Sequence, residues 1–156
     1  MPGCGKSSIA KSFSEKFSYT LLDLDDLIQK STSKKISDIF SQLGEIYFRH
    51  CEHKLLKKIP LNHKLIIALG GGIVVNEKNY PFIKNIGTTI YLFCHPSLLY
   101  HNLLNDYRRP NIPLNISSIK NLFAYRHKLY LKNSHWTLDC SNLSVNDIIQ
   151  KLNCFR

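Results

Sequence analysis

Apolar residues recur every three or four positions over several stretches of the 156-residue chain. This spacing places them on one face of a helix. Ile9, Phe13 and Phe17 are an example. The pattern predicts helices over residues 6–17, 36–59, 77–84, 96–105, 117–133 and 144–153. Gly44 interrupts the second of these stretches and predicts a bend between two helices.

Short, continuous apolar runs lie between the predicted helices and are typical of strands buried in a parallel sheet. They cover residues 19–24, 65–69, 88–93 and 135–139. Trp136, in the last run, is expected in the core. Strands that alternate with helices predict an α/β fold of three layers, a parallel sheet with helices on both faces. The sequence shows no repeat, low-complexity tract or linker, so residues 1–156 are interpreted as a single domain.

The net charge of +10 raises the question of nucleic-acid binding. The lysines are spread along the chain and accompany many Asn and Ile residues, a combination typical of an AT-rich genome. We therefore expect the charge to attract anionic substrates and not nucleic acid. No apolar run reaches the ~20 residues of a membrane span, so no membrane partner is expected. The five cysteines are odd in number and form no C-x-x-C pair, which favours free thiols and a cytoplasmic location.

Residues 1–8 read M-P-G-C-G-K-S-S and match the end of the phosphate-binding pattern G-x-x-x-x-G-K-[ST]. Gly3 and Gly5 allow backbone conformations that turn successive N–H groups toward one anion. Lys6 can reach the β- and γ-phosphates of a nucleoside triphosphate, and the Ser7 hydroxyl can bind Mg²⁺. The alternative is a glycine-rich turn before an ordinary helix. The predicted nucleotide-binding residues are Pro2, Gly3, Cys4, Gly5, Lys6, Ser7 and Ser8.

The first glycine of this pattern would stand one residue before Met1, and the strand that leads into such a loop would precede it. We expect the upstream reading frame to encode about five to seven apolar residues, a usual strand length, followed by glycine. A chain that starts at Met1 is expected to fold poorly, because each buried polar group without a partner costs ~1–3 kcal/mol.

Asp23 and Asp25 stand at the end of the first predicted strand. Residues two apart on a strand point to the same side, so we expect both carboxylates to face one spot at the carboxyl edge of the sheet. One carboxylate could hold a water of Mg²⁺ and the other a substrate hydroxyl. The alternative is a solvated strand end, with Asp26 acting as a helix cap.

Three glycines, Gly70, Gly71 and Gly72, follow the second predicted strand and would let backbone N–H groups approach a ligand. Arg49 and Glu52 lie three residues apart on a predicted helix, so they can pair. Arg126 stands on a later helix, and arginine is scarce, with five in the chain. Because lysine is the usual cation in this chain, the presence of arginine suggests that its planar, forked guanidinium group is needed to bind a carboxylate.

The run His50 to His53 also contains Cys51 and Glu52 and looks at first like a set of metal ligands. A zinc site needs four ligands, or three and a water, and no second cluster is evident in the sequence. A helix also spreads four successive residues over several faces. We therefore do not expect a metal site at this run.

The quoted pieces occur in an order that closely resembles shikimate kinase, a small P-loop kinase of the nucleoside-monophosphate-kinase type. The matching runs cover essentially the whole chain and read P-G-C-G-K-S, L-L-D-L-D, I-F-S-Q-L-G-E-I-Y-F-R-H-C-E, L-G-G-G, R-R-P and Y-R-H-K-L-Y. The resemblance implies transfer of a phosphoryl group from ATP to the 3-hydroxyl of shikimate, with Mg²⁺, on the route to aromatic amino acids. A monomer is expected.

The resemblance also implies a role for each candidate residue. Lys6 and Ser7 would serve the phosphates and Mg²⁺, Asp23 would hold the metal through water, and Asp25 would accept from the reacting hydroxyl. The expected acceptor-binding residues are Asp25, Arg49, Gly70, Gly71, Gly72 and Arg126, with Glu52 orienting Arg49.

Arg109 matches the arginine of a lid, about residues 106–116, that closes over the phosphates. Here Arg109-Pro110 is followed by Asn-Ile-Pro-Leu where the family reads Leu-Leu. Asn102 stands where the family usually offers an arginine near the adenine, so nucleotide affinity is expected to be weaker than is typical. The alternatives are another small-molecule P-loop kinase, such as a gluconate-type kinase, and a degenerate relic that binds nucleotide without catalysis.

Overall fold

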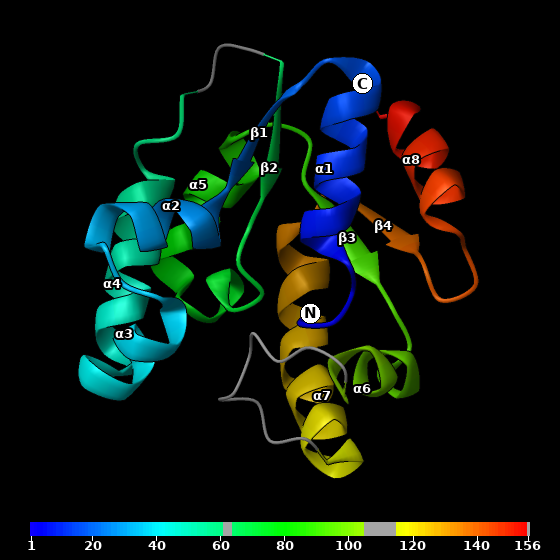
Figure 1. Ribbon diagram of the computed structural model, residues 1–156. Coiled ribbons are helices and arrows are strands. Elements are labelled where there is room, and N and C mark those ends of the chain that lie inside the picture. The colour runs from blue at the N-terminus through cyan, green and yellow to red at the C-terminus, as the bar shows by residue number, and fades with distance from the viewer. Residues whose placement is uncertain (61–63, 105–114, 156) are drawn as a thin grey trace.

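The computed structural model describes residues 1–60, 64–104 and 115–155, and Figure 1 traces them. The predicted lid, including Arg109, lies largely outside these residues. The strands are β1 (Thr20–Asp23), β2 (Leu65–Ala68), β3 (Ile90–Phe93) and β4 (Trp136–Asp139). The helices are α1 (Lys6–Phe17), α2 (Leu24–Thr32), α3 (Ile36–Gln42), α4 (Gly44–Leu56), α5 (Tyr80–Asn85), α6 (Pro96–Leu104), α7 (Ile116–Asn133) and α8 (Val145–Asn153), with 3-10 helices η1 (Ile73–Val75) and η2 (Glu77–Asn79).

The predicted helices are confirmed, and α2 is a helix that the sequence analysis did not predict. The first strand ends at Asp23, one residue before the predicted end, because Asp23 caps α2: its side chain accepts a hydrogen bond from the Asp25 N–H at 3.0 Å. Leu24 and Ile28 then bury one face of the new helix. α3 ends just before Gly44 and α4 begins at it, as the predicted bend requires, and Gly44 has a left-handed φ of 79°.

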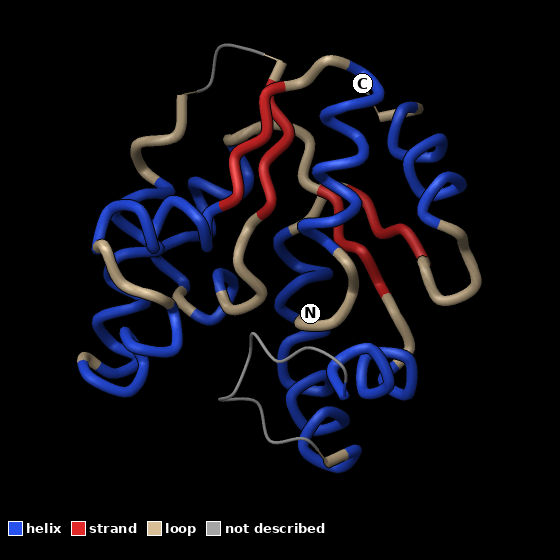
Figure 2. Tube along the Cα trace, in the orientation of Figure 1, coloured by secondary structure: helices blue, strands red, loops and turns tan. Residues whose placement is uncertain are grey.

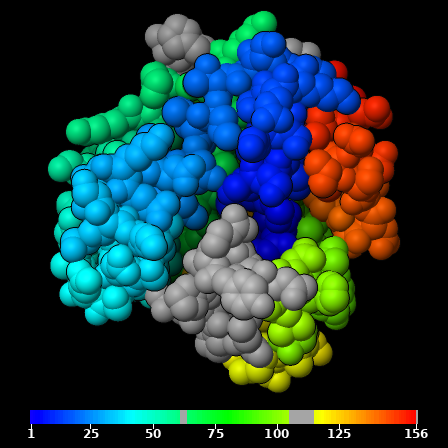
Figure 3. All heavy atoms as spheres, viewed as in Figure 1, coloured from blue at the N-terminus to red at the C-terminus, as the bar shows by residue number. Residues whose placement is uncertain are grey.

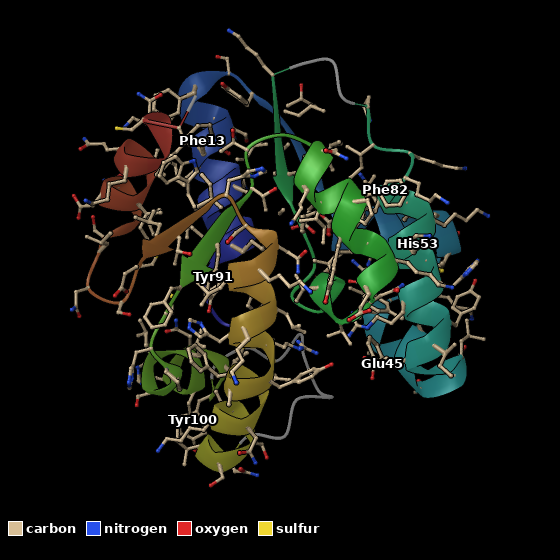
Figure 4. The ribbon with its side chains drawn as sticks, turned by 180° about the vertical axis from the view of Figure 1, so that it is seen from behind. Phe13, Glu45, His53, Phe82, Tyr91 and Tyr100 are labelled. Carbon is tan, nitrogen blue, oxygen red and sulfur yellow. The ribbon has the colours of Figure 1, made fainter. Side chains whose placement is uncertain are left out.

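The four strands form two parallel pairs. β1 pairs with β2, with Thr20 opposite Leu65, and β3 pairs with β4, with Ile90 opposite Trp136. Figure 2 shows the pairs as separate units. α1 and α8 cover the face seen in Figure 1, and α5 and α7 lie on the opposite face, seen in Figure 4. In Figure 3, α2 to α4 form a flank beside α1. The α/β fold with helices on both faces agrees with the prediction.

Apolar side chains between the strand pairs and the helices form the core. Its fully buried members include Leu24, Ile28, Ile39, Ile83, Leu99, Leu103, Ile119 and Ile149. The prediction that Trp136 lies in the core is wrong, because its exposed fraction is 55%. The reason is the place of its strand: β4 has β3 as its only neighbour in the described part of the chain, and Trp136 packs at the surface on Phe155, with 5.3 Å between ring centroids. None of the described helices is long and apolar enough to cross a lipid bilayer.

The amino end of the chain lies inside the molecule, between the carboxyl ends of β2 and β3. Met1 is 4% exposed. A Cβ atom on Gly71, just after β2, would lie 3.4 Å from the Pro2 nitrogen. A Cβ atom on Gly3 would lie 2.9 Å from the carbonyl oxygen of Leu99, which belongs to the helix after β3. The first residues therefore contact both the loop after β2 and the helix after β3, and so connect the two strand pairs.

An apolar strand fused in front of Met1 is expected to stabilise the protein. Within the described residues β2 and β3 each have one strand neighbour, so an extension of about five to seven apolar residues and a glycine can pair with both. Each new backbone hydrogen bond contributes ~0.5–1.5 kcal/mol. We expect the Tm of the extended chain to rise by several degrees, since 1 kcal/mol corresponds to roughly 2–4 °C in a chain of this size. A Gly/Ser extension of equal length is the control, and equal Tm values for both extensions would contradict the prediction.

Candidate active site

The phosphate-binding loop leads from the amino end directly into α1. Gly3 and Gly5 both adopt left-handed backbone angles, with φ of 80° and 73°, which other residues rarely adopt. Lys6 begins the helix, and Gly5 before it supplies no side-chain cap. The first N–H groups of α1 are therefore available to an anion, and the helix dipole favours negative charge at this end.

The other predicted members of the loop surround this helix end. Pro2 and Cys4 are buried and fix the loop to the core, whereas Ser7 and Ser8 are exposed on the first turn. α6 packs against the loop from the side, because the Asn102 amide donates a hydrogen bond to the Gly3 carbonyl oxygen at 2.8 Å. Asn102 thus supports the loop backbone, a contact that sequence spacing could not reveal.

Ser7 and Asp23 come together although they are sixteen residues apart. The Ser7 hydroxyl donates a hydrogen bond to Asp23 Oδ2 at 2.7 Å, and Asp23 Oδ1 accepts from the Asp25 N–H. Hydroxyl and carboxylate oxygens suit Mg²⁺, which in kinases takes one or two protein oxygens together with waters and phosphates. The pair fits a magnesium ion beside the phosphate-binding loop. No cluster of three or more His, Cys, Asp or Glu ligands occurs within the described ranges.

The strand-based explanation for Asp23 and Asp25 is wrong, because Asp25 lies in the first turn of α2 and not on the strand. The helix cap brings the two residues together instead. Asp25 nevertheless faces the glycine loop: its Oδ1 would lie 3.1 Å from a Cβ atom on Gly70. Asp26 is exposed, and the cap that the alternative assigned to it belongs to Asp23.

A buried ion pair stands on α4. Arg49 Nη1 lies 2.5 Å from Glu52 Oε2, and the Glu52 side chain is fully buried. On its other side Arg49 Nη2 lies 2.7 Å from Glu45 Oε1. The pairing with Glu52 agrees with the sequence analysis, which missed Glu45 although the spacing of four residues could have indicated it. Arg49 is thus held between two carboxylates that fix its guanidinium plane.

Burial raises the pKa of Glu52 above the ordinary value of 4.5, and the Arg49 charge opposes this effect without cancelling it. The charges of Asp25 and Arg126 also act on Glu52. The side chains of Arg49, Arg126 and Asp25 therefore all lie close enough to Glu52 for their charges to act on it. The structure thus brings together residues that the sequence analysis named as candidates for acceptor binding.

Two of the three glycines, Gly70 and Gly72, are required by the side chains around them. A Cβ atom on Gly70 would lie 2.5 Å from Glu52 Oε1, and a Cβ atom on Gly72 would overlap the Arg49 guanidinium. Both contacts would be closer than a real Cβ atom comes to other atoms. The glycines therefore let the ion pair of α4 lie directly against the loop backbone, a cause that the sequence analysis did not consider.

Arg126, on α7, closes the other side of the loop. Its Nη1 donates a hydrogen bond to the Gly71 carbonyl oxygen at 3.2 Å. Its Nε is buried without a hydrogen-bond partner, and so is Glu52 Oε1. Buried polar atoms are rarely left unpaired in a folded protein, because each costs free energy. These two atoms mark a place where a polar ligand can be bound.

A phosphate-binding loop beside two half-buried arginines is an arrangement that suits a P-loop kinase acting on a small acceptor molecule. The model of the family described as shikimate kinase matches residues 2–154. The shikimate kinase of Bacillus cereus (strain G9842) is 34% identical over 151 residues, which are 96% of this chain and 90% of that protein. The shikimate kinase of Persephonella marina is 34% identical over 128 residues, or 82% of this chain and 78% of that protein. The chain belongs to the shikimate kinase family.

Solved structures agree with this assignment. The shikimate kinase from Acinetobacter baumannii in complex with shikimate superposes with a TM-score of 0.90 at 28% identity, covering 97% of this chain and 87% of that one. The shikimate kinase from Aquifex aeolicus gives a TM-score of 0.82 at 27% identity, covering 97% and 89%. The protein is therefore a kinase, an ATP phosphotransferase with a nucleotide-binding P-loop fold.

The raised pKa of Glu52 gives a test of the buried ion pair. Between pH 4.5 and the raised value the folded protein holds a proton that the unfolded chain has released. The free energy of unfolding contributed by Glu52 therefore falls as the pH rises through this window. We expect the difference in unfolding free energy between wild type and Glu52→Gln, from urea titrations, to fall through the window and then level off. A difference that rises with pH, or does not change, would contradict the assigned environment.

Proposed function

We propose that the chain transfers the γ-phosphoryl group of ATP to the 3-hydroxyl of shikimate, with Arg49 and Arg126 holding the shikimate carboxylate. Family membership supports the reaction. The observation that carries the acceptor assignment is the buried Arg126 Nε without a partner, beside an Arg49 guanidinium fixed by Glu52 and Glu45. Two arginines at one place suit a carboxylate, which accepts paired N–H donors.

The phosphate-binding loop supplies the nucleotide site. The N–H groups at the start of α1 and the Lys6 ammonium would hold the phosphates of ATP. Charge spreads over the phosphoryl oxygens in the transition state, so fixed positive charge at this place lowers the barrier. Arg109, from the predicted lid, would add a further charge over the phosphates.

Ser7 and Asp23 would hold Mg²⁺, Ser7 by its hydroxyl and Asp23 through a bound water. The ion would neutralise charge on the β- and γ-phosphates. The existing hydrogen bond between the two side chains at 2.7 Å keeps both oxygens at one place and so supports this assignment.

Asp25 would accept a hydrogen bond, and then the proton, from the attacking hydroxyl. Its Oδ1 faces Gly70, and the backbone N–H groups of the glycine loop would contact the other hydroxyls of shikimate. The protein does little covalent work in this mechanism. Its contribution is to hold the acceptor in line with the γ-phosphoryl group.

We further propose that the enzyme works as a monomer in the cytoplasm. All five cysteines are free, and three of them, Cys4, Cys94 and Cys140, are buried. Free thiols are typical of a reducing compartment.

A coupled assay that measures ADP release tests the proposed function. We expect release that depends on shikimate and on Mg²⁺, with little release on gluconate or on water alone. Turnover with gluconate and not with shikimate would favour a different small-molecule kinase. ATP binding without any turnover on shikimate would favour the non-catalytic relic.

Lys6→Met is expected to lower kcat by several orders of magnitude with little change in Tm, because the cation acts on the transition state and is not part of the core. Lys11→Met, on the exposed side of the same helix, is the matched control. Near-normal kcat in Lys6→Met would refute the assignment of the loop.

Arg49→Ala and Arg126→Ala are each expected to weaken shikimate binding by ~2–4 kcal/mol, as the loss of a charge-assisted contact does. The affinity for ATP, measured separately by calorimetry, should hardly change. Lys128→Ala, an exposed position on α7, controls for a general loss of positive charge. If the affinity for ATP falls and the affinity for shikimate does not change, the assignment of these arginines to the shikimate site is wrong.

A further inference from the structure

A tyrosine that has no assigned role holds the glycine loop. Tyr130 lies one helical turn after Arg126 on α7, and its hydroxyl donates a hydrogen bond to the Gly71 carbonyl oxygen. This is the same oxygen that accepts from Arg126 Nη1. Burial raises the pKa of Tyr130 to about 12, so the hydroxyl stays protonated and remains a donor at neutral pH. A buried tyrosine on a backbone carbonyl within the acceptor site invites a functional explanation.

The geometry of the peptide bond gives that explanation. The Gly71 carbonyl and the Gly72 N–H belong to one planar trans peptide unit, so they point in opposite directions. Tyr130 and Arg126 hold the carbonyl on the α7 side and thereby aim the Gly72 N–H away from α7. No hydrogen bond from this N–H is found among the described residues. It is free to donate to a ligand.

The same peptide unit lies against the phosphate-binding loop. A Cβ atom on Gly71 would lie 3.4 Å from both the Pro2 nitrogen and the Pro2 Cδ. Gly71 is therefore in contact with the nucleotide side through Pro2 and with the acceptor side through Arg126. A shift of this unit would change the distance between the two substrates.

We propose that Tyr130 is a positioning residue for the acceptor. Its hydroxyl fixes the Gly71–Gly72 peptide so that the Gly72 N–H can donate a hydrogen bond to a hydroxyl of the acceptor. Tyr130 and Arg126 both donate hydrogen bonds to the Gly71 carbonyl oxygen. Without the hydroxyl, Arg126 is the remaining donor to this carbonyl and is drawn toward it, away from the carboxylate. This inference rests on the proposed function.

Tyr91 provides a matched control. Its ring stacks on the Tyr130 ring, with 4.8 Å between centroids and 24° between planes. Its hydroxyl lies 3.2 Å from His127 Nδ1, and among the described residues no hydrogen bond joins it to the glycine loop. Figure 4 labels Tyr91 beside α7. Tyr130→Phe and Tyr91→Phe therefore each remove one hydroxyl from the same aromatic stack and leave both rings in place.

The experiment compares wild type, Tyr130→Phe and Tyr91→Phe by steady-state kinetics with ATP and shikimate and by thermal melting. We expect Tyr130→Phe to raise the KM for shikimate about tenfold, the size of one lost hydrogen bond to a buried group. The KM for ATP should stay within about twofold, and Tyr91→Phe should leave both KM values unchanged. A Tm loss of similar size in both variants, without a selective change in the KM for shikimate, would assign Tyr130 a structural role and overturn the inference.

Wild-type activity separates the two proposals. If wild type phosphorylates shikimate and the KM values of Tyr130→Phe match those of Tyr91→Phe, the positioning role fails and the proposed function stands. If wild type does not phosphorylate shikimate, the proposed function fails and the positioning role fails with it.

Discussion

The buried ion pair between Arg49 and Glu52 is the constraint on which the site depends. A charged group inside a protein is stable only with a close partner, and the Glu52 carboxylate is fully buried. The pair reaches its depth because Gly70 and Gly72 have no side chains in its way. α4 is thereby drawn against the carboxyl end of β2. The middle residue of the same loop, Gly71, meets α7 through Arg126 and the amino end through Pro2. α4 lies between β1 and β2 in the chain, and α7 lies between β3 and β4, so the loop connects the two strand pairs, which form separate sheets in the described residues.

This arrangement suits phosphoryl transfer because its groups are fixed before the substrates arrive. Arg49 is held by two carboxylates, Ser7 by Asp23, and the phosphate-binding loop by Asn102 on α6. Little reorganisation is then needed when charge develops on the phosphoryl group. The cost of the arrangement is visible as well: two buried polar atoms have no partner, and the pKa of Glu52 is raised. A bound carboxylate would relieve part of that cost.

Patterns local to the sequence predicted much of this structure. Except for α2, the helices follow from apolar spacing, the phosphate-binding loop from its glycines and Lys6, and the Arg49–Glu52 pair from their separation of three residues. Errors arose where two signals competed. Asp23 does end the strand, but it also caps a helix, so Asp25 lies in the first turn of α2 and not on the strand. Trp136 stands in an apolar run typical of a buried strand, but its side chain lies at the surface. The contacts of Asn102 and Tyr130 with glycine carbonyls could not be predicted, since 99 and 59 residues separate the partners.

The most direct test of the central claim is the affinity for shikimate of a Gly72→Ala variant, measured by titration calorimetry. The added methyl group must displace the Arg49 guanidinium, because the two would overlap. We expect the affinity for shikimate to fall by ~100-fold, comparable to the loss of a charged contact, while the affinity for ATP is kept. A Gly72→Ala variant that folds normally and binds shikimate as tightly as wild type would show that the buried ion pair does not set the acceptor site.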